Sequence, residues 1–200
     1  MRGVLFAVFL AAASATVSAA DSYTSAVSAV HRDDYDFAAQ LFRPLAEQGH
    51  VGAQSFLGAL YANGQGVPQN YEMAGRWYRQ AADQGDAVAQ FNLGVRYDNG
   101  QGAPQSYAEA GRWYRRAAQQ GHARAQSNLG VLYANGQGVP KDVIRAYLWL
   151  TVAVAGSRGN AVKTAIMNQT TVASDMTAAQ NEQAQEMARR CQETQFVQCE

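Results

Sequence analysis

A repeat of 36 residues constrains this sequence more than any other feature. Shifting the chain against itself by 36 positions superposes identical residues in three consecutive units. The matched sets are Ala53, Ala89 and Ala125; Leu57, Leu93 and Leu129; Tyr61, Tyr97 and Tyr133; and Trp77, Trp113 and Trp149. A fixed period of about 20 to 50 residues is typical of solenoids, in which each unit packs only on its neighbours.

The first half of each unit predicts a helix. In the first unit Ala53, Leu57, Gly58 and Tyr61 follow the spacing i, i+4, i+5 and i+8, which places them on one face of a helix. A glycine inside a helix is unfavourable, so Gly58 and its repeated counterparts predict a neighbouring helix backbone too close for a side chain. The Asn-Gly-Gln-Gly segment at residues 63–66, repeated at 99–102 and 135–138, ends this helix.

The second half of each unit predicts an amphipathic helix with its own N-cap. Tyr71, Ala74, Trp77 and Tyr78 lie on one stripe, with charged and polar residues between them. Asp, Asn and Ser side chains can accept a hydrogen bond from a free first-turn N–H group. Such residues occur in register at Asp34, Asn70, Ser106 and Asp142. The four positions predict the starts of four second helices.

The predicted fold is therefore all-α, an α-solenoid of helix-turn-helix repeats. At the C-terminal end, the capping box from Thr177 to Gln180 predicts the start of a last, polar helix. We divide the chain into a signal peptide (1–20), N-terminal capping helices forming a half repeat (21–52), three repeats (53–88, 89–124 and 125–160), and C-terminal capping helices with a tail (161–200).

The N-terminus has the pattern of a secretory signal peptide. Arg2 precedes an apolar run from Val4 to Ala13, and small residues follow up to Ala20. The run is too short to span a bilayer, so we expect cleavage after Ala19 or Ala20 and no membrane insertion of the mature chain. The sequence therefore predicts a periplasmic or secreted protein.

Composition adds two expectations. The full chain has 16 basic and 16 acidic residues, and loss of the signal peptide removes one basic residue, Arg2. The mature chain would therefore have a net charge of about −1, which favours binding neither to nucleic acid nor to anionic membranes. The two cysteines, Cys191 and Cys199, lie close together near the C-terminus. In an oxidising compartment they either form a local disulfide or stay as two separate thiols.

The repeat unit resembles the Sel1-like repeat, a relative of the tetratricopeptide repeat with a longer loop. The resemblance rests on A-x-x-x-L-G-x-x-Y-x-x-G-x-G-[VA]-P followed by A-x-x-W-[YL]-x-x-A-x-x-x-G, and it covers about residues 34 to 160. It implies a right-handed α-solenoid that holds other proteins in signalling, envelope or host-interaction settings. It does not identify the partner.

The residues give no indication of an enzyme or a cofactor. The sequence lacks a nucleophile elbow, a phosphate-binding lysine loop and a Cys-His metal cluster. His50 and His122 are two repeats apart, too far to share a metal ion. Some cysteine-rich secreted relatives of the resembled family have been linked to β-lactam binding or hydrolysis, but they carry a cysteine pair in each repeat and this chain does not.

We predict a non-enzymatic scaffold that binds an unidentified protein or peptide. The tetratricopeptide relationship implies that the first helices line the concave side, and their free face would carry the contact residues. These residues are Ser55, Phe56, Ala59, Phe91, Asn92, Val95, Ser127, Asn128 and Val131. The alternatives are that Phe56 and Phe91 pack against adjacent helices, that the chain acts on β-lactams, or that it is a structural spacer or self-assembling component. The sequence leaves the oligomeric state open.

Overall fold

The described part of the chain is an all-α structure. A computed structural model describes residues 18–196 and 199. Within these residues there are ten α-helices and no strand: α1 (Ala19–His31), α2 (Tyr35–Glu47), α3 (Val51–Asn63), α4 (Tyr71–Asp83), α5 (Ala87–Asn99), α6 (Tyr107–Ala118), α7 (Ala123–Asn135), α8 (Val143–Gly156), α9 (Asn160–Ser174) and α10 (Ala178–Glu193). None of these helices is long and apolar enough to cross a membrane. The predicted signal peptide falls mainly on residues 1–17, outside the described residues, and stays a prediction.

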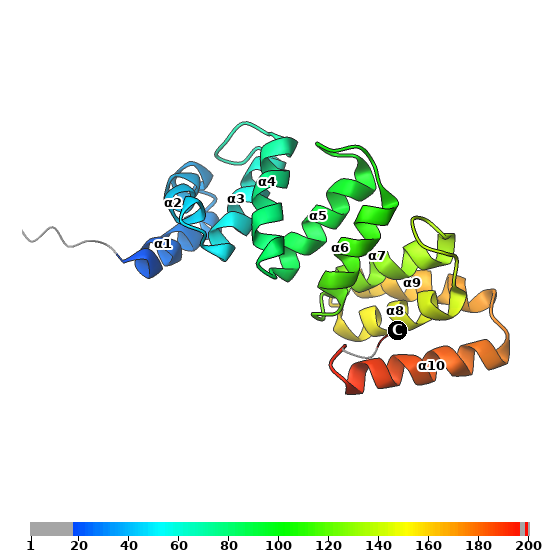
Figure 1. Cartoon of the computed structure of the whole chain (residues 1–200). Helices are drawn as coiled ribbons and strands as arrows, with labels where there is room; N and C mark the ends of the chain where they lie inside the picture. Colours follow the sequence, from blue (N-terminus) through cyan, green and yellow to red (C-terminus); the bar gives the residue numbers. More distant parts are fainter. Residues whose placement is uncertain (1–17, 197–198, 200) are drawn as a thin grey trace, which may run out of the picture.

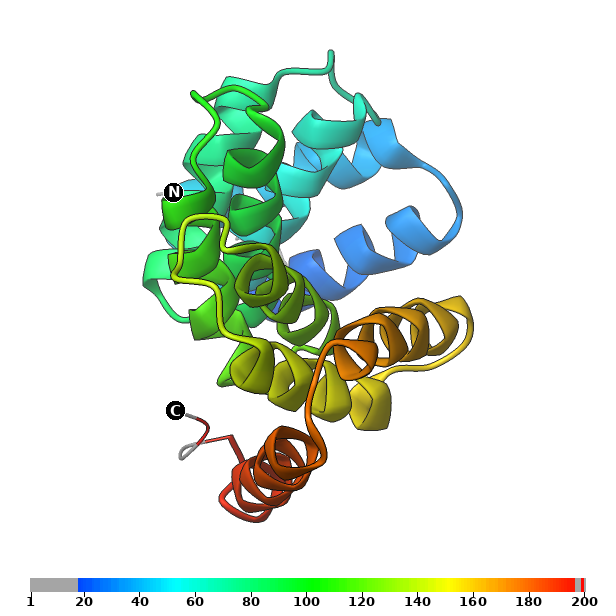
Figure 2. The same cartoon turned by 90° about the vertical axis from the view of Figure 1, so that its right-hand side faces the viewer.

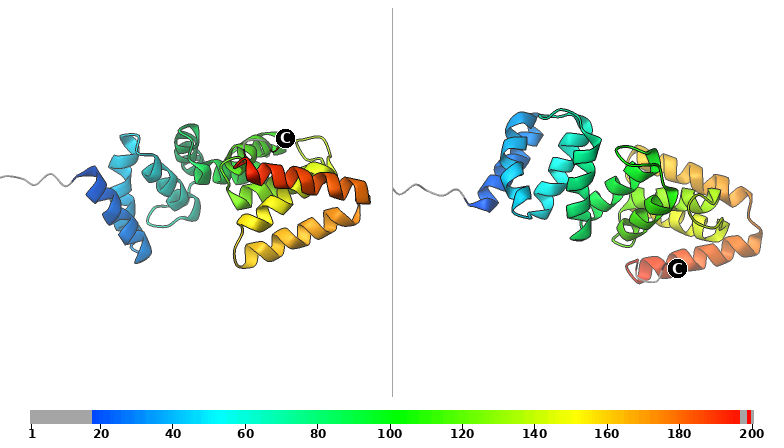
Figure 3. Two further views of the ribbon diagram at one scale, coloured as in Figure 1. Left: turned by 90° about the horizontal axis from the view of Figure 1, so that it is seen from below. Right: turned by 45° about the horizontal axis from the view of Figure 1, so that its top comes forward.

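The helices form a right-handed solenoid, as predicted. Each first helix packs on the second helix of its own unit, and each second helix also packs on the first helix of the next unit. Figure 1 shows the helix pairs following one another along the chain. The two views of Figure 3 show α1 and α10 at opposite ends of the array. Figure 2, which faces the C-terminal end, shows α10 lying outside α8, and the two helices are in contact.

The helix boundaries follow the predicted caps. The side chains of Asp34, Asn70, Ser106 and Asp142 each accept a hydrogen bond from the third N–H group of α2, α4, α6 and α8. The first helices of the three repeats end on a left-handed glycine with φ 68°. The N-cap prediction is confirmed for all four second helices, and the capping box predicted at Thr177 starts α10.

The Asn-Gly-Gln-Gly loop also holds neighbouring units together. A Cβ atom at Gly66 would lie 2.2 Å from the backbone carbonyl group of Tyr35, the first residue of the preceding second helix. The same contact recurs in the third repeat, where Gly138 lies against Tyr107. The second glycine of the loop therefore allows the loop to rest on the backbone of the previous unit.

The prediction for the mid-helix glycines is wrong in the first two repeats and agrees in part in the third, where a Cβ atom at Gly130 would lie 2.8 Å from the Leu150 side chain and 3.1 Å from the backbone carbonyl oxygen of Ala146. A Cβ atom at Gly58 would lie 2.7 Å from the aromatic ring of Tyr78, and one at Gly94 would lie 2.6 Å from the ring of Tyr114. In these first two repeats the space is thus filled by a tyrosine ring from the second helix of the same unit, not by a helix backbone. The sequence pattern showed that space was needed and could not show which atoms occupy it.

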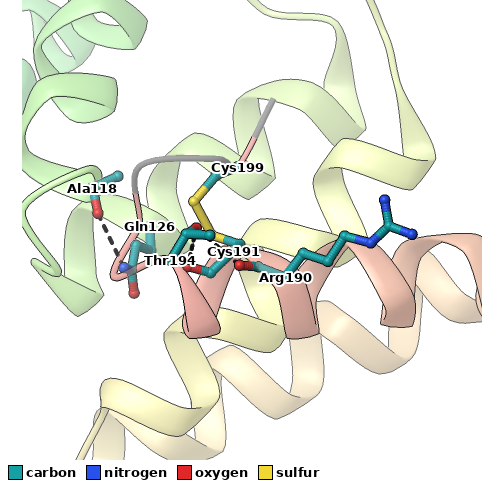
Figure 4. The surroundings of a disulfide bond; sticks show 6 residues. All are labelled: Ala118, Gln126, Arg190, Cys191, Thr194 and Cys199. Carbon is teal, nitrogen blue, oxygen red and sulfur yellow. Dashed lines mark hydrogen bonds between the residues drawn. A yellow bond between two sulfur atoms is a disulfide. The ribbon is translucent and has the colours of Figure 1, made fainter.

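Buried glutamines connect consecutive repeats through a series of hydrogen bonds. Gln90 Nε2 donates to the carbonyl oxygen of Ala82 (3.1 Å), and Gln90 Oε1 accepts from Gln120 Nε2 (2.7 Å). Gln54 forms the corresponding bonds one repeat earlier, and Gln126 donates to the carbonyl of Ala118 (Figure 4). Because a buried amide without partners is costly, these bonds help to fix the register of one unit on the next.

The C-terminal end of the array is closed by packing and by a disulfide. The helix α8 contacts α7, α9 and α10, so its apolar side chains are covered from three sides. A disulfide joins Cys191 in the last turn of α10 to Cys199, and both residues are buried (Figure 4). The tail turns back after α10, so that the ring of Phe196 lies against Gly121 at the turn between α6 and α7.

Candidate functional site

Two adjoining hollows follow the first helices, and together we call them the first-helix groove. One, of ≈ 230 Å³, is lined mainly by residues of α3 and by the start of α5; the other, of ≈ 540 Å³, lies between the starts of α5 and α7 and the end of α8. Val88 and Asn92 line both. The residues that define the groove are Tyr23, Gly52, Ser55, Phe56, Ala59, Asp86, Val88, Phe91, Asn92, His122, Ala123, Arg124, Gly156, Ser157, Arg158 and Ala161.

The groove brings together five of the nine residues that the sequence placed on the free face. They are Ser55, Phe56, Ala59, Phe91 and Asn92. The other four, Val95, Ser127, Asn128 and Val131, are half-buried and do not line these hollows. Val95 packs against the core around α7 and α8 instead.

The two phenylalanines form walls of the groove and are not free anchors. Phe56 is stacked on Phe42 of α2, with ring centroids 4.9 Å apart. Phe91 is stacked on His122, with a centroid separation of 4.6 Å, and it also contacts Tyr114. The alternative that these residues pack against adjacent helices is therefore correct. Neighbouring helices lie close enough to cover one side of each ring, which spacing along one helix could not show.

The exposed apolar surface of the groove is centred on Val88, which sequence reasoning missed. Its relative exposure is 51%, and it is one of four large hydrophobic residues that are exposed in the described part of the chain. The signal was present in the repeat register, because the matching positions hold Gly52 and Arg124. Only the second repeat places an apolar side chain at this point.

The polar groups of the groove differ between its two halves. In the smaller hollow, Asp86 caps α5 by accepting from the Ala89 N–H group (2.6 Å), and it also accepts from the Ser55 hydroxyl (3.1 Å). The larger hollow carries the exposed cations Arg124 and Arg158. The groove thus offers a carboxylate at one end, an apolar centre and two positive charges at the other. This arrangement suits a polypeptide segment, which carries apolar and charged groups, better than a small molecule with one kind of chemical group.

His122 belongs to both the groove and the helix start. Its Nδ1 accepts a hydrogen bond from the Ala125 N–H group (3.2 Å), so the imidazole is the N-cap of α7. A protonated imidazole cannot accept this bond. Burial lowers the pKa of His122, because the charged form loses hydration in the packed site.

This cap predicts a specific dependence of stability on pH. The pKa of folded His122 lies below its ordinary value of 6.5, so the stability contributed by the neutral form is complete above pH 6.5. It is lost as pH falls through 6.5 toward the lower pKa of the folded state. We expect His122→Asn, which keeps a capping oxygen and has no imidazole to protonate, to remove this pH-dependent loss.

The measurement is urea unfolding of wild type and H122N at pH 7.5 and pH 5.5. The exposed His31 at the end of α1 provides the control variant His31→Asn. Equal pH dependence in wild type and H122N would show that the His122 cap does not sense pH.

The described residues contain no group of three or more His, Cys, Asp or Glu side chains that could hold a metal ion.

The comparison with known families agrees with the geometry. The family model described as Sel1 repeat matches residues 29–50, 51–86, 87–122 and 123–156, more than half of the chain. The chain belongs to the Sel1 repeat family. Proteins of this family are generally scaffolds for protein–protein interaction. The matched Sel1 units begin two residues before the units we counted from Ala53.

Two solved structures show the same Sel1 architecture. A Sel1 repeat protein from Oxalobacter formigenes has a TM-score of 0.67 and 36% identity, over 70% of this chain and 56% of that one. A protective antigen present in uropathogenic Escherichia coli strains, which displays an SLR fold, has a TM-score of 0.62 over 90% of this chain and 48% of that one. At 24% identity the second match concerns the fold alone. The chain spans about half the length of these structures. No match was found among curated proteins.

Proposed function

We propose that this Sel1 repeat protein is a non-enzymatic scaffold of the cell envelope that binds a peptide segment of a partner protein in the first-helix groove. The observation that carries the proposal is the exposed Val88 between two hollows, one with an acidic group and one with two arginines. Apolar contact supplies affinity and the flanking charges fix the direction of the segment. The envelope location rests on the signal-peptide pattern of the sequence.

The chemistry of the groove specifies the bound segment. An apolar side chain would cover Val88, and a basic or hydrogen-bond-donating group would face Asp86. An acidic group would face Arg124 and Arg158. Asn92 lies on both hollows and can bind backbone amides of the segment through its side-chain oxygen and nitrogen.

A substitution at Val88 tests the groove with little risk to folding. Val88 is the second residue of α5, where an acidic side chain is compatible with the positive end of the helix dipole. We expect Val88→Asp to fold normally and to weaken partner binding at least about tenfold, because it places a charge in the apolar centre. Val88→Ile should preserve binding.

The partner is first identified by a photo-crosslinking side chain placed at position 88 in the native cell envelope, with position 112 as the control. Arg112 is exposed on the second helix α6, outside the groove. The affinity of the captured partner is then measured for wild type, V88D and V88I, with circular dichroism as the folding check. Equal capture from both positions, or equal affinity of wild type and V88D, would contradict the proposal.

The two other functions give different results with the same purified protein. A spacer or self-assembling component would crosslink to itself and show a mass in light scattering that rises with concentration. An enzyme acting on β-lactams would hydrolyse them in solution. A hydrolysis assay on the wild-type protein tests this function, because the V88D variant tests only protein binding.

A further inference from the structure

Arg96 departs from the repeat in a way that the scaffold function does not explain. Its register positions in the other repeats hold Leu60 and Leu132, which are buried. Arg96 is buried as well, with a relative exposure of 4%. Its Nη1 atom has no hydrogen-bond partner among the described residues, and no ion pair of Arg96 occurs among them. A buried cation without a carboxylate is strongly unfavourable unless a ligand compensates it.

The residues around Arg96 leave room for its guanidinium group. A Cβ atom at Gly75 would lie 3.0 Å from Arg96 Nη2, and one at Gly102 would lie 2.4 Å from the same atom. The guanidinium carbon also lies 5.7 Å from the centre of the Tyr71 ring. Two glycines and an aromatic ring thus surround the cation, and none of these groups neutralises it.

A cavity of ≈ 550 Å³ adjoins this cation between α4 and α5. Arg96 lines it together with Arg76, Arg79 and Glu72, so that three positive charges face one negative charge. Ala103 also lines the cavity. The matching positions of the first and third repeats hold the larger residues Val67 and Val139. The second repeat therefore differs from the other two at two positions on the wall of this cavity. It has an arginine where they have leucine, and an alanine where they have valine.

Arg79 is held in place on the same cavity wall. It donates a hydrogen bond to the Tyr97 hydroxyl (2.7 Å), and its guanidinium carbon lies 4.7 Å from the centre of the Trp113 ring. A positioned arginine loses less entropy on binding an anion than a mobile one.

We propose that this cavity binds a carboxylate, which pairs with Arg96 and is held from the other side by Arg79. Arginine presents parallel N–H groups that match the two oxygens of a carboxylate. Burial lowers the pKa of Arg96, which is consistent with a cation that lacks a compensating charge. None of the residues lining this cavity lines the first-helix groove, so the proposal goes beyond the proposed function and stands independently of it.

A carboxylate is favoured over a phosphate by the charges around the cavity. Glu72 lies on its wall, and Arg96 and Tyr97 belong to the last turn of α5, where the helix dipole is negative. Both features oppose the two charges that a phosphate concentrates on one group more than the single charge of one carboxylate group. The carboxylate comes either from an acidic side chain of a protein segment or from a free organic acid, and the experiment separates these two sources.

The test compares wild type with Arg96→Leu by calorimetric titration at low salt. The probes are a pentaglutamate peptide, succinate and inorganic phosphate. R96L should fold, because Leu132 occupies the same place in the third repeat, with Cδ1 3.5 Å from a Cβ atom at Gly111. We expect saturable carboxylate binding to wild type and a loss of at least about tenfold in R96L.

Thermal unfolding gives the second measurement. Without ligand, R96L should unfold about 5 °C higher than wild type, because leucine replaces an uncompensated buried charge. Pentaglutamate should raise the midpoint of wild type and leave that of R96L unchanged. Tighter binding of the peptide than of succinate indicates an acidic protein segment, and equal binding per carboxylate indicates a free acid; both support a carboxylate site.

Three results would overturn the proposal: no binding of any probe to wild type, affinities of wild type and R96L within twofold, or tighter binding of phosphate than of both carboxylates. The variant Arg79→Gln should weaken binding without the thermal gain of R96L, because Arg79 is not the buried, uncompensated group. The groove variant V88D should bind the peptide like wild type, so a failure of the groove proposal and a failure of this one are distinguishable.

Discussion

Gly138→Ala is expected to lower the free energy of unfolding by about 4 kcal/mol, the sum of backbone strain and a steric clash. Gly138 has φ 68°, a left-handed conformation that an alanine adopts only with strain. A Cβ atom there would also lie 2.2 Å from the carbonyl carbon of Tyr107. Because the contact atom belongs to the backbone of α6, no side-chain rotation can relieve the clash, and the loop has to leave the preceding repeat.

Gly136→Ala provides a control with the same backbone angle. Gly136 also has φ 68°, but a Cβ atom there would lie 3.1 Å from the Cβ atom of Lys141, a much less severe contact than the one at Gly138. We expect G136A to cost about 1 to 2 kcal/mol, mainly the backbone strain. Urea unfolding followed by circular dichroism measures both variants. Equal losses in G136A and G138A would show that the loop does not press on Tyr107.

The sequence predicted local structure well because the signals for helix starts and ends are local. Asp34, Asn70 and Ser106 needed only their own position before an apolar stripe to be recognised as N-caps, and the structure confirms them. Glycine and proline residues marked the ends of the helices, and therefore the positions of the loops, in the same local way. Repetition then strengthened each assignment, because an error would have had to recur three times.

Contacts between units were harder to predict, because they depend on which atoms meet across helices. Gly58 signalled a close contact, yet only the structure shows that the Tyr78 ring makes it. Phe56 and Phe91 are on the predicted face, but neighbouring rings cover one side of each. Spacing along one helix gives the direction of a side chain and not the distance to the next helix.

The candidate sites lie where the repeats differ from one another. The register that fixes the fold is shared, whereas Val88 replaces Gly52 and Arg96 replaces Leu60 at matching positions of the second repeat. Sequence reasoning that searched for identities along the offset passed over these differences. A search for departures from the repeat, especially a charge at a buried position, would have found Arg96 without any structure.

The second large effect is expected from the last repeat, where Trp149→Ala should lower the free energy of unfolding by about 4 kcal/mol. Trp149 is fully buried at 0% exposure, since α8 is covered by α7, α9 and α10. Alanine would leave a cavity that these helices cannot fill without losing the contacts that close the solenoid. The loss is measured by urea unfolding followed by circular dichroism.

Two further variants show whether burial of the ring is the cause of this loss. The indole Nε1 of Trp149 has no hydrogen-bond partner among the described residues, so Trp149→Phe should cost only about 1 to 2 kcal/mol, the smaller volume. Trp77 occupies the same register position in the first repeat and is only half-buried, so Trp77→Ala should cost less than W149A. If W77A and W149A lowered stability equally, the repeat position alone would set the contribution of the tryptophan, and the closing helices α9 and α10 would add nothing to it. A larger loss in W149A assigns the difference to the full burial of the Trp149 ring, which the half-buried Trp77 lacks.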